Sequence, residues 1–193
     1  MPARSKRRAV EAGSRPTVPN LRITDRVPTA ARRVGAGDVI LVCPWLAGLP
    51  RESALWISAL PIHDANGFVD GDLCVEAPAK IRSRLYFGVF ALDRLRSCDQ
   101  LLEGLRNKGV ERLINLPSVS FFDASTARTF DMLDFNLDQE IAFLLRARHA
   151  GFAVALCARR GSTFSHAEAF DFVLLHDGPG APMELVQSRP QPS

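Results

Sequence analysis

The fold class follows from one stretch of the sequence, Glu111-Arg-Leu-Ile-Asn-Leu-Pro-Ser-Val-Ser-Phe-Phe-Asp123. A short apolar run ends here in Leu113 and Ile114, and Asn115 and Pro117 follow at once. Because proline has no N–H to give to a sheet, the strand cannot continue through it, so we expect Asn115 at a strand's carboxyl end. In parallel α/β folds, ligands bind at that end of the strands.

The rest of the chain repeats this strand–helix pattern. A helix is predicted over residues 136–150, because its apolar residues recur at helical spacing: Leu137, Ile141, Leu144 and Leu145. Further strands are expected over residues 38–43, 83–90, 152–157 and 172–175, with a weaker extended segment at 18–23, and further helices over 28–34, 93–109 and 165–170. This alternation is typical of a parallel sheet with right-handed crossovers. Periodicity permits either a doubly wound sheet or part of a (β/α)₈ barrel.

The domain organisation is one folded unit with a tail at each end. The chain has 193 residues and 47% hydrophobic content, enough for one domain with a substantial core. Residues 1–17 are rich in arginine without periodicity and are predicted to be a disordered basic tail. Residues 18–180 form the predicted domain, and the proline-rich residues 181–193 are predicted to be a flexible C-terminal tail.

The net charge of +3 is divided unevenly along the chain. Nine of the 24 basic side chains and two of the 21 acidic ones lie in residues 1–33, so the remainder carries 15 basic and 19 acidic side chains. The folded part is therefore mildly acidic, and no aromatic side chains interleave the basic tail to stack on bases. These features argue against nucleic acid as a partner.

Other bulk features point to a cytoplasmic protein. No apolar run reaches the roughly 18 residues of a membrane span, and the basic N-terminus lacks the apolar core of a signal peptide. Cys43, Cys74, Cys98 and Cys157 are widely spaced, without metal-ligand spacing. Cys43 and Cys157 lie within apolar strand-like runs and are expected to be reduced core thiols.

Five sequence motifs, taken in order, resemble one family: Leu60-Pro-Ile-His-Asp-Ala-Asn66, Phe87-Gly-Val-Phe-Ala-Leu-Asp93, Ile114-Asn-Leu-Pro-Ser-Val119 with Asp123, Leu137-Asp-Gln-Glu140 and His176-Asp-Gly178. Over residues 38–180 the chain resembles the phosphoenolpyruvate hydrolase-like family, TIM-barrel signal-transduction proteins distantly similar to phosphoenolpyruvate mutase. The resemblance implies an incomplete TIM-type (β/α) barrel, with about six parallel strands and helices outside. It also implies activity on phosphoenolpyruvate-like compounds and oligomeric assembly.

The chain departs from the family pattern in several places. His63 stands where members carry glycine, Ala91-Leu-Asp-Arg94 replaces a Gly-Thr-Asp-Pro turn, and the glycine-rich loop after His176 is reduced to Gly178-Pro-Gly180. The last two βα units of a complete barrel are absent. The chain thus resembles a shortened, diverged member whose sheet has two open edges, which water or a partner must satisfy.

The candidate site residues lie at strand ends or helix starts. Asp64 and Asp93 are the predicted ligands of a Mg²⁺ cofactor, because carboxylate oxygens bind this ion and bridge it to substrate. The alternative for both is capping of a helix N-terminus. Asp93 and His176 are the candidate catalytic residues, with His176 as a general acid or base. A satisfied structural histidine is an equal alternative for His176.

Four residues are candidates for substrate binding: Asn66, Asn115, Asp123 and Glu140. Three of them have an alternative role without ligand contact. Asn115 could be a turn residue, Asp123 a solvated loop carboxylate, and Glu140 part of a solvated helix face that Asp138 would share. The expected ligand is a small anionic oxoacid or phosphoenolpyruvate-like compound.

Two functional interpretations follow. The first is a metal-assisted hydrolase or lyase acting on phosphoenolpyruvate-like substrates. The second is a catalytically degenerate barrel that serves as a binding or partner subunit, and it rests on the missing glycines and βα units. Under either interpretation we expect a homo-oligomer or association with a full-length relative, and no membrane partner.

Overall fold

A computed structural model describes residues 20–28, 35, 37–50, 53–60, 63–71 and 75–187. Its strands are β1 Leu21–Thr24, β2 Val39–Val42, β3 Leu85–Gly88, β4 Arg112–Ile114, β5 Ala153–Arg159, β6 Phe172–His176 and β7 Met183–Gln187. Its α-helices are α1 Ala54–Ser58, α2 Ala79–Arg82, α3 Cys98–Asn107, α4 Ala124–Asp131 and α5 Leu137–His149. Short 3₁₀ turns are η2 Pro44–Leu46, η3 Gly67–Val69, η4 Val119–Phe121 and η5 Ala167–Ala169.

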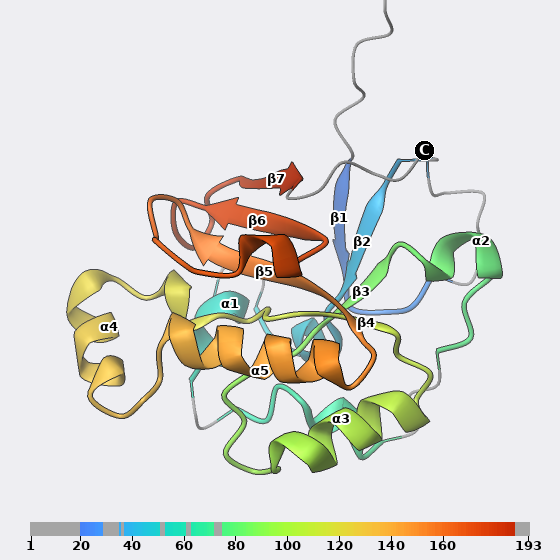
Figure 1. Cartoon of the computed structure of the whole chain (residues 1–193), viewed down its shortest axis with the longest axis horizontal. Coiled ribbons are helices and arrows are strands. Elements are labelled where there is room, and N and C mark those ends of the chain that lie inside the picture. Colours follow the sequence, from blue (N-terminus) through green and yellow to red (C-terminus); the bar gives the residue numbers. More distant parts are fainter. Residues whose placement is uncertain are drawn as a thin grey trace, which may run out of the picture.

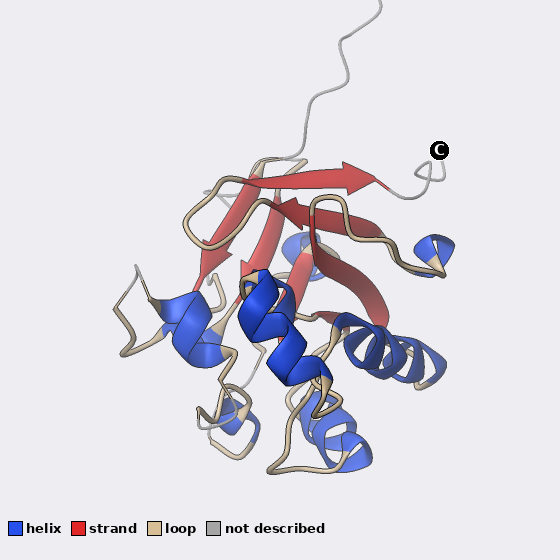
Figure 2. Ribbon diagram, turned by 90° about the vertical axis from the view of Figure 1, so that its left-hand side faces the viewer, coloured by secondary structure: helices blue, strands red, loops and turns tan. Residues whose placement is uncertain are grey.

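The strands pair strictly in sequence order, β1 to β7, in one curved sheet. The pairs from β1 to β6 are parallel, and β7 runs antiparallel to β6. The result is a mixed α/β fold with a nearly closed, barrel-like sheet. The helices lie on the outside, with α3 and α5 along the lower face in Figure 1 and the curvature of the sheet visible in Figure 2. The six predicted parallel strands are confirmed, including the weaker one at the N-terminal side.

Strands β2 to β6 bury both of their faces. In β2, Ile40 and Val42 join the apolar cluster beneath the helices, whereas Leu41 and the following Cys43 join the cluster inside the curved sheet. A strand covered on both faces requires a continuous apolar run, which is the pattern of parallel sheets. Cys43 and Cys157 are buried and unpaired with another cysteine, which confirms them as core thiols.

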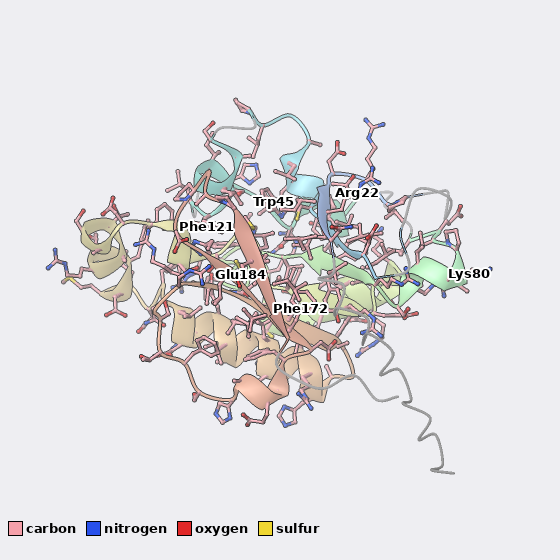
Figure 3. The ribbon with its side chains drawn as sticks, turned by 90° about the horizontal axis from the view of Figure 1, so that it is seen from above. Arg22, Trp45, Lys80, Phe121, Phe172 and Glu184 are labelled. Atoms are coloured by element: carbon pink, nitrogen blue, oxygen red, sulfur yellow. The ribbon has the colours of Figure 1, made fainter. Side chains whose placement is uncertain are left out.

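Side chains fill the interior near the amino ends of the strands. The Tyr86 ring packs edge-on against Phe172, with ring centroids 4.8 Å apart. The Tyr86 hydroxyl donates to Asp171 at 2.6 Å, and Arg112 pairs with the same carboxylate at 3.3 Å. Figure 3 shows Phe172 near the centre of the molecule and Lys80 of α2 at its periphery. The inner space is therefore blocked at this end, and a ligand must enter from the other.

The C-terminal segment corrects one prediction. Residues 183–187 form β7 and pair along the whole of β6, so a flexible tail is wrong for them. Met183 and Leu185 pack on the inner apolar cluster, while Glu184 and Val186 point outward, the alternation of a half-buried strand. This strand was not predicted because its apolar alternation is short and directly follows Pro179 and Pro182, which are typical of loops. Residues 188–193, the basic tail and nearly all of the helix expected over 28–34 lie outside the described residues.

Two predicted helices have different boundaries. The helix expected from residue 93 begins at Cys98, because Ser97 and Gln100 form a capping box at its start. The helix expected over 165–170 is only the 3₁₀ turn η5. The helix predicted over 136–150 is confirmed as α5, and the Asn136 side chain caps it by accepting from Gln139 N at 3.0 Å.

Gly88, at the end of β3, lies where backbone and side chains from two neighbouring strand ends meet. A Cβ atom there would lie 2.5 Å from the Leu116 carbonyl oxygen and 2.7 Å from Cys43 Sγ. Trp45 Nε1 also donates to the Gly88 and Leu116 carbonyls, at 3.2 and 3.0 Å. This shared donor holds the backbone at Gly88 close to the backbone at Leu116.

We expect Gly88→Ala to lower the free energy of unfolding by about 2 kcal/mol, because the added methyl group overpacks a rigid site. The matched control is Gly37→Ala, where a Cβ meets nothing within 4 Å. Urea denaturation of both variants is the measurement. Equal stability of the two would contradict the close approach at Gly88.

Candidate functional site

The register of β5 and β6 brings two polar side chains together at the carboxyl end of the sheet. Arg159 ends β5, His176 ends β6, and the two residues are paired in the ladder. Both share the inward-facing side of their strands with residues of the inner cluster, namely Cys157 and Leu174. Polar groups thus follow apolar ones inside the sheet at the rim where parallel strands end.

Asn115 fastens the end of β4 to β5. Its Oδ1 accepts from Cys157 N at 2.6 Å, and its Nδ2 donates to the Cys157 carbonyl at 3.0 Å. The same Nδ2 donates to Glu140 Oε2 at 2.7 Å. Asn115 is fully buried, so these bonds replace the ladder contacts that β4 gives up where it leaves the sheet before Pro117.

Glu140 is fully buried, so the alternative of a solvated helix face is wrong for it, whereas Asp138, two residues earlier in α5, is exposed as that alternative expects. The predicted contact of Glu140 with substrate stays a prediction. Besides Asn115, the Glu140 carboxylate accepts from Ser118 Oγ at 2.7 Å and from Val119 N at 2.9 Å. Burial raises the pKa of Glu140 to about 7, and the three donated hydrogen bonds oppose that rise.

Two serine hydroxyls link Glu140 to His176. Ser118 Oγ lies 2.8 Å from Ser120 Oγ, and Ser120 Oγ lies 2.9 Å from His176 Nε2. The Phe121 ring stacks on the imidazole at 3.9 Å between centroids. Burial, and secondarily the Arg159 charge, lowers the pKa of His176 to about 4, so this imidazole is neutral at pH 7. The Nδ1 atom of His176 is buried without a hydrogen-bond partner.

A cavity of about 300 Å³ opens beside this chain of hydrogen bonds. Its walls come from η4, α4, the start of α5 and the end of β5, and its polar lining consists of Ser120, Arg128, Asp131, Asn136, Arg159 and Ser162. The Asp131 carboxylate accepts from Asn136 Nδ2 at 2.7 Å. The cavity therefore holds two cationic side chains and two hydroxyls, against one carboxylate that is already hydrogen bonded.

Arg159 is the unusual member of the lining. Its Nε is buried without a hydrogen-bond partner, and within the described ranges its guanidinium forms no ion pair. The neighbouring Arg160 differs, because it is paired with Asp177 at 3.2 Å and with Glu184 at 2.6 Å on the surface. A partly buried guanidinium without a carboxylate partner favours an anionic ligand.

The residues predicted to bind metal form a separate group around Arg96. Its guanidinium pairs with Asp64 at 2.8 Å and Asp93 at 3.1 Å, and also contacts Asp70. Arg96 lowers the pKa of Asp64 and, in turn, its own pKa is raised by these carboxylates. Asn66 Nδ2 donates to Asp93 Oδ2 and to the Phe90 carbonyl, both at 2.9 Å.

This arrangement does not fit a Mg²⁺ ion, because Arg96 already supplies the positive charge between the carboxylates. The Mg²⁺ prediction therefore gains no support from this group of residues. Asp93 Oδ1 instead accepts from Leu95 N at 2.7 Å and Arg96 N at 3.2 Å, which orders the turn before α3. The roles predicted for Asp64, Asn66 and Asp93 toward a ligand stay predictions.

Asp123 caps α4. Its Oδ1 accepts from Ser125 N at 2.8 Å and from Thr126 N at 2.9 Å. The Ser125 hydroxyl, which donates to the same oxygen at 2.6 Å, together with these two N–H donors holds the pKa of the exposed Asp123 at about 2, below its usual value. The cavity lining includes both chain neighbours, Phe122 and Ala124, but not Asp123 itself. Its predicted contact with substrate stays a prediction.

The structure thus divides the predicted residues into two groups and one cap. Asn115, Glu140 and His176 share one hydrogen-bonded network, while Asp64, Asn66 and Asp93 share the other. Sequence reasoning missed Ser118, Ser120, Arg159 and Ser162. Their position in the sequence could have indicated two of them. Arg159-Arg160-Gly-Ser162 comes just after the apolar strand predicted over 152–157, in the same way that Asn115 and His176 come just after their predicted strands.

Comparison with known proteins finds a relative but no family. No model of a known protein family matches the chain. The uncharacterized protein y4oT of Sinorhizobium fredii (strain NBRC 101917 / NGR234) is 31% identical over 116 residues, which is 60% of this chain. The match covers 58% of the length of that curated relative. No helix in the described part of the chain combines the length and hydropathy that a membrane crossing requires.

Proposed function

We propose that this protein is a TIM-type barrel, shortened and diverged from the phosphoenolpyruvate hydrolase-like pattern, that binds a small anionic oxoacid or phosphoenolpyruvate-like compound. The ligand occupies the cavity between η4, α4 and β5. The observation that carries the proposal is Arg159, whose buried Nε has no protein partner and whose side chain lines the cavity. The position agrees with the general rule that such folds bind ligands at the carboxyl ends of parallel strands.

The lining fits this ligand class by size and by chemistry. A volume of about 300 Å³ is at the lower end of small-molecule sites and suits a compound of a few carbon atoms. Arg159 and Arg128 offer N–H donors to a carboxylate or phosphate, and Ser120 and Ser162 add hydroxyls. Ala127, Phe135 and Leu137 give the apolar part of the wall.

We expect Arg159→Gln to weaken binding of pyruvate and of phosphoenolpyruvate about 30-fold, because a charge-assisted hydrogen-bond pair to the anion is lost. Isothermal titration calorimetry measures the affinities. The matched control is Arg160→Gln. This variant removes the same charge from the next residue in the chain, whose side chain forms ion pairs on the surface instead of lining the cavity. Equal loss in both variants would show a general charge effect and overturn the proposed site.

The choice between enzyme and binding subunit rests on turnover. An active hydrolase or lyase releases pyruvate or phosphate from phosphoenolpyruvate, and His176 is then the imidazole whose Nε2 reaches the cavity through Ser120. The Arg96 ion pairs favour the alternative, a catalytically degenerate barrel, because they occupy the carboxylates assigned to metal. The open edges of β1 and β7 support the accompanying proposal of an oligomer or of association with a full-length relative.

A further inference from the structure

The hydrogen bonds from Glu140 to the cavity form one continuous chain. Glu140 Oε2, Ser118 Oγ, Ser120 Oγ and His176 Nε2 follow one another at 2.7, 2.8 and 2.9 Å. Glu140, Ser118 and His176 are fully buried, whereas Ser120 lines the cavity wall. Ser120 is therefore the end of the chain that a ligand can reach.

Only one of Glu140's partners can accept a proton from it. Val119 N is a donor, and the Asn115 amide is fixed because its Oδ1 faces Cys157 N and its Nδ2 faces the Cys157 carbonyl. The Nδ2 group must therefore donate to Glu140. Ser118 Oγ is the remaining partner, so a protonated Glu140 donates to Ser118 and an ionised Glu140 accepts from it.

The hydrogen count at Ser118 makes the two hydroxyls reverse together. Ser118 Oγ has one hydrogen and two lone pairs, and Ser120 N occupies one lone pair at 3.1 Å. When Glu140 is ionised, Ser118 donates to Glu140 and accepts the Ser120 hydroxyl hydrogen. When Glu140 is protonated, Ser118 accepts from Glu140 and donates to Ser120 Oγ. The Ser120 hydrogen is then released from the chain.

The direction of the Ser120 hydroxyl decides what it offers to the cavity. We assign the proton of the neutral His176 to Nε2, because its buried Nδ1 has no hydrogen-bond partner that could accept from it. With Glu140 ionised, the Ser120 hydrogen then points inward, and Ser120 Oγ accepts from this Nε2–H. With Glu140 protonated, Ser120 accepts from Ser118 and His176 and points its own O–H toward the cavity. Only the second state can donate a hydrogen bond to an oxyanion held by Arg159.

We propose that Ser120 is a ligand-contacting residue whose hydrogen-bond direction is set by Glu140 through Ser118, so that an oxyanion enters the cavity together with one proton. The inference rests on the proposed anion site and adds its proton linkage. Ser120 touches the ligand, whereas Glu140 and Ser118 are positioning residues. The proton reaches Glu140 from solvent along the same hydroxyls.

The protonation states around the chain support this linkage. Burial raises the pKa of Glu140 to about 7, so both of its states are populated near neutral pH. Burial also raises the pKa of the Cys157 thiol, whereas it lowers that of His176 to about 4, so neither of these two titrates between pH 6 and 8. The other charged side chains that face the chain or the cavity are Arg128, Asp131, Arg159 and Asp177.

The test is calorimetric titration of the whole protein with pyruvate, whose carboxylate keeps its charge from pH 6 to pH 8. We expect the affinity to fall about tenfold from pH 6 to pH 8, because the protonated fraction of a group with pKa near 7 falls by that factor. At pH 7, two buffers of different ionisation enthalpy should report uptake of up to about half a proton per pyruvate bound, because about half of the free protein is already protonated.

Variants distinguish the role of the hydrogen-bond chain from that of the other cavity residues. Ser118→Ala and Glu140→Gln should each still bind pyruvate but lose the pH dependence and the proton uptake. Ser165→Ala is the matched control, because Ser165 is exposed and lies outside both the cavity lining and the hydrogen-bond chain, so this variant should keep both. Circular dichroism establishes folding of each variant. Proton uptake that persists in Ser118→Ala would overturn the inference.

A measurement without ligand adds an independent check. At pH 8 the proposed hydrogen count requires His176 to carry its proton on Nε2, which ¹⁵N chemical shifts report. The Nδ1–H tautomer would overturn the inference whatever the binding results. Pyruvate binding that needs Arg159 but does not vary with pH overturns only the proton linkage, whereas binding that does not need Arg159 overturns the proposed function.

Discussion

Asn115→Ala should lower the free energy of unfolding by about 4 kcal/mol, a large loss for a single polar side chain. The substitution removes both partners of the buried Cys157 backbone and one donor to Glu140. Each buried polar group left without a partner costs about 1–3 kcal/mol. A loss of this size is a large fraction of the roughly 5–15 kcal/mol that stabilises a typical domain.

Urea denaturation and thermal melting measure this loss, with a drop in Tm of about 10 °C for a chain of this length. Asn136→Ala is the matched control, because it removes the same amide from an N-cap near the surface, where the cost is about 1 kcal/mol. If the Asn115 variant loses no more stability than the Asn136 variant, the link from β4 to β5 through Asn115 is not what holds the rim together.

The second large effect is a pair of opposing pH dependences. The pKa of Glu140 in the folded protein, about 7, lies above its ordinary value of 4.5, so the folded state binds more protons and Glu140's contribution to stability is lost as pH rises from about 4.5 to 7. The pKa of His176, about 4 instead of 6.5, has the opposite sign, so stability rises from about pH 4 to 6.5. Each contribution is about 3 kcal/mol.

The two slopes overlap between pH 4.5 and 6.5, so we expect a nearly flat stability profile there in the unmodified protein. Glu140→Gln should unmask the histidine and gain about 3 kcal/mol as pH rises from 4 to 6.5. His176→Asn should unmask the carboxyl group and lose a similar amount from 4.5 to 7. Urea denaturation across pH gives these curves, and profiles of the same shape in all three proteins would refute the buried titrations.

Strands β2 to β6 were predictable from sequence because each is a continuous apolar run closed by a polar or proline signal, whereas β1 is only weakly apolar and β7 was not predicted. Asn115 before Pro117 predicted the end of β4, and His176 after the apolar run 172–175 predicted the end of β6, both at the carboxyl ends of the strands. These signals are local, so they need no knowledge of the partner strand. The alternation of strands and helices predicted the parallel direction of the strands but left their order open between a doubly wound sheet and a barrel, and the strands pair in sequence order.

The chemical surroundings were not predictable, because they depend on contacts between distant segments. Glu140 sits beside exposed Asp138 in the sequence and resembles a solvated residue, yet donors from η4 surround it. Arg96 joins Asp64, 32 residues away, and spacing alone gives no sign of that pair. Arg159 belongs to the site because of strand parity, and an all-apolar strand does not reveal which of its faces is inner.

The antiparallel direction of β7 has a practical consequence for attaching other sequences. Gln187 lies beside Phe172 at the amino end of β6, and Leu21 begins β1 at the same end of the sheet. The start of β1 and the end of β7 therefore lie at the end of the sheet opposite Arg159, and both lie in the upper part of Figure 1. A fluorescent reporter or surface tether attached at Leu21 or at Gln187 would join the protein at the end of the sheet opposite the proposed anion cavity, which makes immobilised binding assays practicable.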